Sequence, residues 1–339
     1  GPSRSPCRAF SGMRDAVGPL ANRTTAPETG AETGAGPGDA ETDRMDHKAF
    51  LAELPAETRQ ALTARADGPG LRRLALHGGA ILAIGALIAV QAPGWWLLVP
   101  VQGVLLAFLF TLQHEATHKT PFATERLNEW VGHAAGLAIV QPFEWFRYFH
   151  LAHHRHTNIP GRDPELSAPK PEGWPAFLWH LSALGYWRDK AAVLWRNAFG
   201  AIEGDYLPAR VHPRLRREAR SMLVVYAGVA AFSVLVSPVL IRAWLLPLAV
   251  GFPALRLYLL AEHGRCPEVA DMFDNTRTTF TNRAVRLLSW NMPYHAEHHV
   301  LPQVPFHRLP ELHRLTRAHL RGTEDGYARF ARRYVGGFR

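Results

Sequence analysis

Two long stretches of this 339-residue chain carry no charged side chain. Residues 74–113 and 222–241 hold no Asp, Glu, Lys or Arg, although charged residues make up 20% of the chain. Ala92-Pro93-Gly94 predicts a tight turn that divides the first stretch into two apolar runs of about 20 residues, the length of a helix that crosses a bilayer. Forty residues without a charge are rare in soluble cores, so we favour two membrane spans over a buried soluble helical pair.

The second charge-free stretch pairs with another apolar run, residues 243–261, around Arg242. We therefore expect an all-α integral membrane protein with four transmembrane helices in two hairpins and a cytosolic helical cap. This topology puts 36 of the 38 Lys and Arg residues on one side: 10 in residues 1–73, 14 in residues 114–221 and 12 in residues 264–339. Basic residues favour the cytosolic side, so both termini and the central loop are predicted to be cytosolic.

The chain is predicted to divide into four parts. Residues 1–46 are rich in Gly, Ala, Thr and Pro and predict a disordered tail. Residues 47–73 predict an amphipathic segment before the membrane, residues 74–321 the membrane catalytic domain, and residues 322–339 a C-terminal tail. Within the catalytic domain, Trp and Tyr residues interleaved with apolar ones in 174–187 and 195–206 predict helices that lie on the membrane.

The net charge of +9 raises the question of a nucleic-acid partner. The basic residues are dispersed among apolar and aromatic ones, and no zinc-finger, basic-zipper or RNA-binding pattern appears, so an anionic lipid surface is the favoured partner. The two cysteines, Cys7 and Cys266, are too few for a disulfide framework or a four-cysteine zinc site.

Three histidine clusters dominate the chemistry of the chain. Segment 114–118 reads His-Glu-Ala-Thr-His directly after the second predicted span, while segments 150–154 and 295–299 both place histidines at i, i+3 and i+4. These spacings put the imidazoles on one helical face, and imidazole is a good ligand for transition metals. Eight histidines are more than one ion can bind, so two metals are predicted. The predicted ligands are His114, His118, His150, His153, His154, His295, His298 and His299.

The fourth predicted span adds two further residues. His263 follows it on the predicted cytosolic side, so we predict a ninth ligand there, with a helix-capping role as the alternative. Arg256 lies inside the span, where snorkelling of the side chain to the interface is favoured over a role near the metals.

Five residues around the clusters are expected to support the ligands. The carboxylates of Glu115, Asp163 and Glu297 are predicted to accept the second ring N–H of ligand histidines. His156 points off the ligand face and is assigned to orienting or substrate contact, while Asn291, one turn before His295, is assigned to reach a metal through water.

These motifs together resemble the membrane fatty acid desaturase family and its hydroxylase relatives. The three boxes occur in order, with Arg155-His-Thr-Asn158, Asp163-Pro-Glu165 and Asn291-Met-Pro-Tyr294 beside them, and the resemblance covers residues 71–321. It implies a centre of two iron ions that itself carries the reaction with O2, with no separate side-chain acid or base, and an acyl or alkyl chain as substrate.

The resemblance also implies an external electron donor of the ferredoxin, rubredoxin or cytochrome b5 type, because the chain has no His-Pro-Gly-Gly or Cys-x-x-Cys motif of a fused one. Three alternatives stay open. The first is hydroxylation; the box Tyr294-His-x-Glu-His-His299 resembles lipid desaturases more than alkane hydroxylases and therefore favours desaturation. The second is an intramembrane zinc protease, which fits His114-Glu-x-x-His118 but leaves the other two clusters unexplained. The third is a non-catalytic metal-binding membrane protein.

Overall fold

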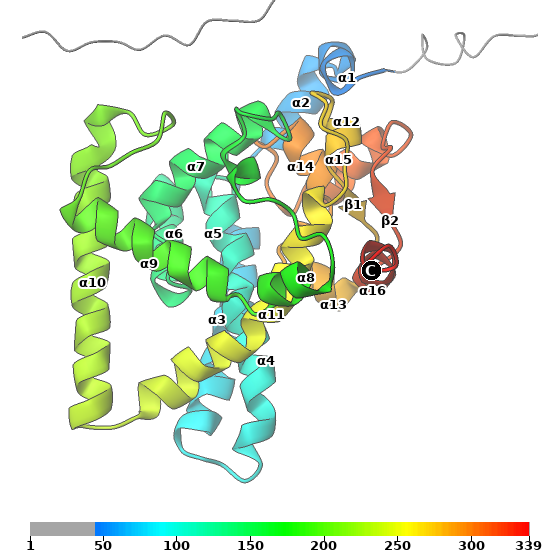
Figure 1. The fold of residues 1–339 in the computed structure, drawn as a ribbon. Coiled ribbons are helices and arrows are strands. Elements are labelled where there is room, and N and C mark those ends of the chain that lie inside the picture. Colours follow the sequence, from blue (N-terminus) through cyan, green and yellow to red (C-terminus); the bar gives the residue numbers. More distant parts are fainter. Residues whose placement is uncertain (1–44, 339) are drawn as a thin grey trace, which may run out of the picture. The chain divides into compact units, whose positions relative to one another are not determined.

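The computed structural model describes residues 45–338, so the predicted disordered tail lies outside the described residues except for Met45 and Asp46. Helices form nearly all of the regular structure there (Figure 1), and the two strands, β1 (Thr278–Thr279) and β2 (Thr323–Glu324), pair in parallel. The helices before residue 200 are α1 (His47–Glu53), α2 (Ala56–Thr63), α3 (Asp67–Ala89), α4 (Trp95–Ala107), α5 (Leu109–Thr117), α6 (Glu125–Ala138), α7 (Phe143–His156), η1 (Pro164–Ser167), α8 (Trp174–Leu181) and α9 (Leu184–Phe199). The later ones are η2 (Ala209–Val211), α10 (His212–Leu235), the π-helical turn η3 (Ile241–Leu245), α11 (Leu246–His263), α12 (Met272–Asn275), α13 (Arg283–Leu288), α14 (His295–Val300), α15 (Leu309–Thr316) and α16 (Tyr327–Val335).

Four helical stretches are long and apolar enough to cross a membrane, as predicted: Ala56–Ala89, Trp95–Thr117, Ala209–Leu235 and Ile241–His263. The helix of the first span, α3, begins at Asp67 and runs across the predicted boundary between residues 73 and 74. An anionic side chain in the first turn is favoured by the helix dipole, and the Asp67 carboxylate also accepts hydrogen bonds from the Thr124 amide and hydroxyl.

The second and fourth spans cross in close contact. A Cβ atom on Gly103 of α4 or on Gly251 of α11 would overlap the backbone of the opposite helix. Small residues allow this approach, which is typical of helix crossings in membranes. At the far end of α11, the Arg242 side chain donates to the Ala89 carbonyl at 3.1 Å and ties η3 to the end of α3.

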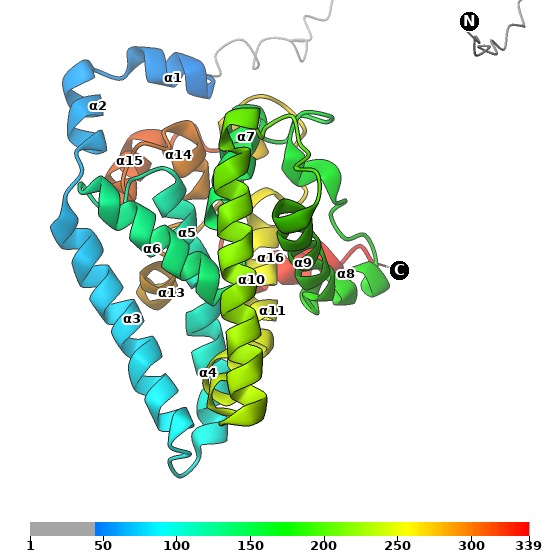
Figure 2. The same cartoon turned by 90° about the vertical axis from the view of Figure 1, so that its left-hand side faces the viewer.

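The remaining helices gather around the ends of these spans. Figure 1 places α1, α2, α7, α14 and α15 at the end opposite the turn between α3 and α4, and Figure 2 shows α10 running alongside α7 and α9. The N-terminus of α7 is capped from α10, because the Glu218 carboxylate accepts hydrogen bonds from the Phe143 and Glu144 amides. The Trp-rich segment forms α8 and α9, which pack on α11 and α10 respectively.

Residues 322–338 contain β2 and α16. The side chains of Phe330 and Tyr334 are buried against Leu260 and Ala261 of α11 and Phe177 of α8. The segment predicted to be a C-terminal tail is therefore packed against the helical body as far as the structure describes it.

Candidate metal centre

Four helices bring the nine predicted ligand histidines together. Helix α5 carries His114 and ends beside His118, α7 carries the second cluster, α11 ends at His263 and α14 begins at His295. Seven of the nine imidazoles are buried, and His118 and His154 are half-buried. The local spacing therefore places each cluster on one helical face, and the fold turns those faces toward one another.

The first metal-binding group consists of five histidines. One nitrogen from each lies within 4.8 Å of the others: His114, His118, His150, His154 and His298. The Nε2 atoms of His118 and His150 are 3.0 Å apart. Both ring nitrogens of His114, His154 and His298 are buried and have no hydrogen-bond partner among residues 45–338. Burying six unpaired polar nitrogens is costly, so the donor set fits a cation that accepts one lone pair from each ring.

The second metal-binding group consists of His153, His263 and His299, with His295 beside them. The Nε2 atom of His263 lies 3.3 Å from Nε2 of His153 and 3.2 Å from Nε2 of His295. The Nε2 atoms of His295 and His299 are 3.1 Å apart. Nitrogens that ligate one ion at about 2.1 Å and at right angles to each other lie about 3.0 Å apart. The spacing therefore fits one ion per group.

The two groups share a boundary. The rings of His154, from the first group, and His299, from the second, stack with centroids 4.0 Å apart and planes 8° apart. Two cations held by these groups would be neighbours, as a centre that handles one small molecule between two metals requires.

The outer nitrogens of the second group are oriented by oxygens, as is usual for metal ligands. Nδ1 of His153 lies 3.0 Å from both carboxylate oxygens of Asp163 and 3.1 Å from Glu165. Nδ1 of His295 lies 3.4 Å from Glu262. His263 and His299 direct Nδ1 at the Asn275 carbonyl and the Thr157 hydroxyl, at 3.2 and 3.1 Å.

The other supporting residues named from the sequence lie in different surroundings. Glu115 is fully buried, accepts hydrogen bonds from Thr120 Oγ1 and the Phe306 amide, and lies 3.6 Å from Nδ1 of His298. Glu297 accepts from Thr278 Oγ1 at 2.5 Å and pairs with His313, which the sequence assigned no role.

His156 is half-buried and belongs to neither metal-binding group. Asn291 donates its side-chain amide to the Phe306 carbonyl at 2.9 Å. The role of His156 in orienting a ligand or contacting substrate, and the approach of Asn291 to a metal through water, thus stay predictions.

Burial keeps most of these imidazoles neutral. It lowers the pKa of His118 to about 3, and it lowers the pKa of His150, His154 and His298 well below the ordinary value, with neighbouring histidines adding to the effect. His153 differs: burial pulls its pKa down, but Glu165 and Asp163 outweigh burial and raise the pKa. Neutral imidazole is the form that binds metals, so these buried histidines favour binding a metal cation over binding protons.

The backbone beside the histidine segments is strained. Lys119, Asn158, Arg265 and Asn291 adopt left-handed conformations with φ of 57°, 57°, 57° and 60°. Each residue lies just after or just before a histidine-bearing segment. Non-glycine residues hold such conformations only where the surrounding structure enforces them, commonly at functional sites.

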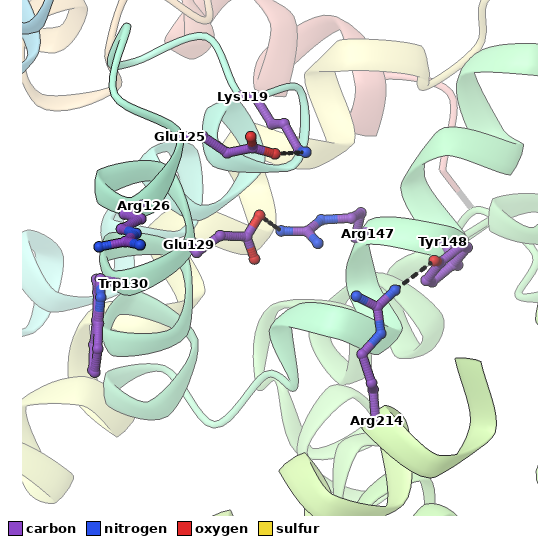
Figure 3. A pocket seen from close by; sticks show the side chains of 8 residues that line it. All are labelled: Lys119, Glu125, Arg126, Glu129, Trp130, Arg147, Tyr148 and Arg214. Carbon is purple, nitrogen blue, oxygen red and sulfur yellow. Dashed lines mark hydrogen bonds and ion pairs between the residues drawn. The ribbon is translucent and has the colours of Figure 1, made fainter. Parts of the chain in front are cut away.

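A surface pocket of about 540 Å³ lies apart from the histidines, between α6, α7 and α10 (Figure 3). Lys119 pairs there with Glu125 and Arg147 with Glu129, while Arg214 donates to the Tyr148 hydroxyl. No histidine of either metal-binding group lines it; its walls are Lys119, Glu125, Arg126, Glu129, Trp130, Arg147, Tyr148 and Arg214.

A third group with metal-binding side chains lies next to this pocket. It consists of Glu129, His133 and Glu144, whose ligand atoms lie within 4.8 Å of one another. Arg147 already bridges the two carboxylates at 2.7 and 3.4 Å, and His133 pairs with Glu218 at 3.0 Å. The acids are therefore neutralised by cationic side chains, and the group is an ion-pair network between helices rather than a third metal site.

Comparison with known proteins agrees with this centre. The model of the fatty acid desaturase family matches residues 93–331. The chain is 25% identical to a Picosynechococcus sn-1 oleoyl-lipid 12-desaturase over 70% of its own length and 73% of the relative. It is 26% identical to the human sphingolipid delta(4)-desaturase/C4-monooxygenase DES2 over 58% of each chain, and 25% identical to a Bradyrhizobium elkanii dihydrorhizobitoxine desaturase over 74% and 75%. The chain belongs to the fatty acid desaturase family and is an oxidoreductase.

Proposed function

We propose that this protein is an O2-dependent di-iron desaturase that introduces a double bond into a fatty acyl or related lipid chain. The convergence of nine histidines in two adjoining groups, several with ring nitrogens that have no partner in the described part of the chain, carries this proposal. Desaturation removes two hydrogens from the chain, takes two electrons from a donor and two protons from solvent, and reduces O2 to two waters. Two bound irons would supply the binding and reduction of O2.

The protein's own contribution is to hold the ligands and to keep water away. His114, His118, His150, His154 and His298 would hold one ion, and His153, His263, His295 and His299 the other. Asp163 and Glu165 keep the Nδ1 proton of His153, so that its Nε2 lone pair points inward. Phe110 and Phe146 stack on His114 and His150 and make the adjoining surface apolar, which suits a hydrocarbon chain and excludes water.

Hydroxylation of the same kind of chain is the second candidate. The human relative is named for both outcomes, desaturase and C4-monooxygenase. The two reactions share the first hydrogen removal and differ in whether a second hydrogen leaves or oxygen returns to the carbon. The intramembrane zinc protease is disfavoured, because Glu115 is buried and hydrogen-bonded instead of being free to act as a base.

We further propose that the four spans form two hairpins, with the histidines and both termini at the cytosolic face, and that electrons come from a separate protein. Basic side chains at that face, such as Lys119, Arg126 and Arg214 around the pocket of Figure 3, would attract an acidic donor. Electrostatic docking of this kind predicts that the reduction rate falls as salt increases. A rate that is constant across a salt titration would exclude it.

The first test measures metal and product together. The protein is purified in detergent, iron and zinc are quantified, and the lipids of an expressing host are profiled by mass spectrometry against a His154→Ala control. About two irons per chain and lipids lighter by two hydrogens are expected. Lipids heavier by one oxygen would establish the hydroxylase, and zinc alone with unchanged lipids would overturn both candidates.

A further inference from the structure

Helix α9 places a half-buried lysine in an aromatic cage. The ammonium of Lys190 lies 4.2 Å from the ring centre of Trp145, 5.1 Å from that of Tyr186 and 5.9 Å from that of Phe149. Within residues 45–338, Lys190 makes no hydrogen bond and no ion pair. Burial, followed by the nearby charge of Arg256, lowers the pKa of this lysine to about 7.

A second cation approaches the same tyrosine from the fourth span. The guanidinium of Arg256 lies 5.7 Å from the ring centre of Tyr186. It donates from Nη2 to Nδ1 of His180 at 2.9 Å and from Nε to the His180 carbonyl at 3.4 Å. The position of Arg256 in the sequence favours a side chain that extends to the membrane interface. In the structure the Arg256 side chain is instead hydrogen-bonded to His180 of α8.

The pair of cations lacks a balancing anion. Among residues 45–338 neither Lys190 nor Arg256 has a carboxylate within ion-pair distance. Asp189, next to Lys190, is 59% exposed and pairs with Arg188. His180, the partner of Arg256, is kept neutral, because burial and the charge of Arg256 lower its pKa to about 4. Two cations next to the apolar part of a membrane protein are costly unless an anion joins them.

Aromatic rings connect this cationic pair to the metal centre. Phe149 stacks on Trp145 and on Phe146, and Phe146 stacks on the ligand His150. A hydrogen-bonded series runs in parallel: the Tyr186 hydroxyl donates to Gln141, whose amide donates to Gln113, the residue before His114. Contacts between aromatic rings of α7 therefore run from Lys190 to His150.

We propose that Lys190 and Arg256, which both contact the Tyr186 ring, bind an anionic group of the substrate, a carboxylate or a phosphate, while the attached chain runs along Phe149 and Phe146 to the metals. This inference rests on the proposed function and narrows its substrate to chains that carry an acidic group. Lys190 and Arg256 are then residues that select the substrate and fix its depth, which decides the carbon presented to the centre.

Equilibrium binding in nanodiscs of neutral lipid, without donor or O2, tests this directly, because no turnover is needed. The dissociation constants of the wild-type protein are measured for two pairs of tritiated ligands. Each pair has an acidic and a neutral member: oleate and methyl oleate, and 1-oleoyl lysophosphatidate and monoolein. The acidic member of at least one pair is expected to bind about tenfold more tightly, as a charged hydrogen bond provides. The pair with the larger ratio tells whether the anion is a carboxylate or a phosphate.

Variants assign the preference to residues. Lys190→Met and Arg256→Met should each remove most of the preference for the acidic ligand and leave the neutral ligand unchanged. Lys190→Arg should keep the preference, as should Arg188→Met, which removes an exposed cation from the same helix. An iron content equal to that of wild type confirms the fold of each variant.

Two results would overturn the proposal: equal binding of acidic and neutral ligands by wild type, or equal preferences in Lys190→Met and Arg188→Met. Lys190 would then serve only to pack against the aromatic rings. Either result leaves the desaturase proposal standing, because iron content and lipid products test that separately. Conversely, acid-selective binding by a protein that yields no unsaturated product would keep the anion site and reject the reaction.

Discussion

The histidines of the second metal-binding group use both ring nitrogens. His153, His263 and His299 point Nε2 inward and direct Nδ1 at an oxygen, from Asp163 and Glu165 for His153, from the Asn275 carbonyl for His263 and from the Thr157 hydroxyl for His299. This division fixes the tautomer, because a proton on Nδ1 leaves the lone pair on Nε2 free for a metal. The first group has fewer such contacts, since neither nitrogen of His114 or His154 has a hydrogen-bond partner in the part of the chain that the structure describes.

Removing the strongest of these contacts should weaken metal binding without removing a ligand. Asp163→Ala deletes both 3.0 Å contacts to His153 and the acceptor of the Asn158 amide. We expect the iron affinity of the second group to fall about 10- to 100-fold, measured as iron per chain after dialysis against graded chelator. Asp205→Ala, at an exposed carboxylate, is the control. Equal iron retention by the two variants would remove Asp163 from the centre.

Substitutions of two neighbouring histidines on α7 should differ sharply in their effect on the iron content. His154 lies within the first group, whereas His156 lies outside both groups. His154→Ala should therefore lower the iron content from about two to about one per chain, while His156→Ala should keep both irons. The iron content of the two purified variants is measured by metal analysis. Loss of iron from His156→Ala would restore the role that the sequence assigned to that residue in orienting a ligand.

The sequence predicted the three clusters because their geometry is local. Spacings of three and four residues put imidazoles on one face of any helix, and that face survives whatever the helix packs against. The carboxylates that orient them depend on tertiary contact instead. Glu262 lies directly before His263 yet contacts His295, and His313 contacts Glu297 from a separate helix, so no local pattern singled out either residue.

At the scale of helices, the apolar runs predicted the four spans but not how the spans meet. The first turn of α3 lies before its apolar run, since Asp67 is held by Thr124 from the α5–α6 connection. The second run is divided between α4 and α5 at Phe108. Hydropathy reports burial in lipid or protein, whereas these features follow from packing against particular neighbours.

The crossing of α4 and α11 should be intolerant of side chains. Gly103→Leu would push a side chain into the backbone of α11 at Pro247 and Gly251. Overpacking of this kind costs about 1–3 kcal/mol, so we expect a lower Tm in detergent and a lower iron content, because α4 leads into the first cluster and α11 into His263. A Cβ atom at Gly228 of α10 would meet no atom of residues 45–338 within 4 Å, so Gly228→Leu is the control. Equal Tm values would mean that the helices separate at little cost.

For the whole molecule, the charge distribution and the positions of the histidines lead to one expectation about sidedness. The turn at residues 90–94 joins α3 to α4 at the end away from the histidine helices (Figure 1), and 36 of the 38 basic residues lie in the segments predicted to share the opposite side. Cytosolic retention of Lys and Arg would then put the turn outside the cell.

Labelling with a membrane-impermeant maleimide tests that orientation in a background of Cys7→Ser and Cys266→Ser. Gln91→Cys, in the turn, should react in intact spheroplasts, because the reagent reaches the outer face. Arg188→Cys, 72% exposed on α9, should react only in inverted vesicles or after permeabilisation. The reverse pattern would put the histidines on the outside, where a soluble cytosolic donor cannot reach them, and the source of electrons would have to be sought elsewhere.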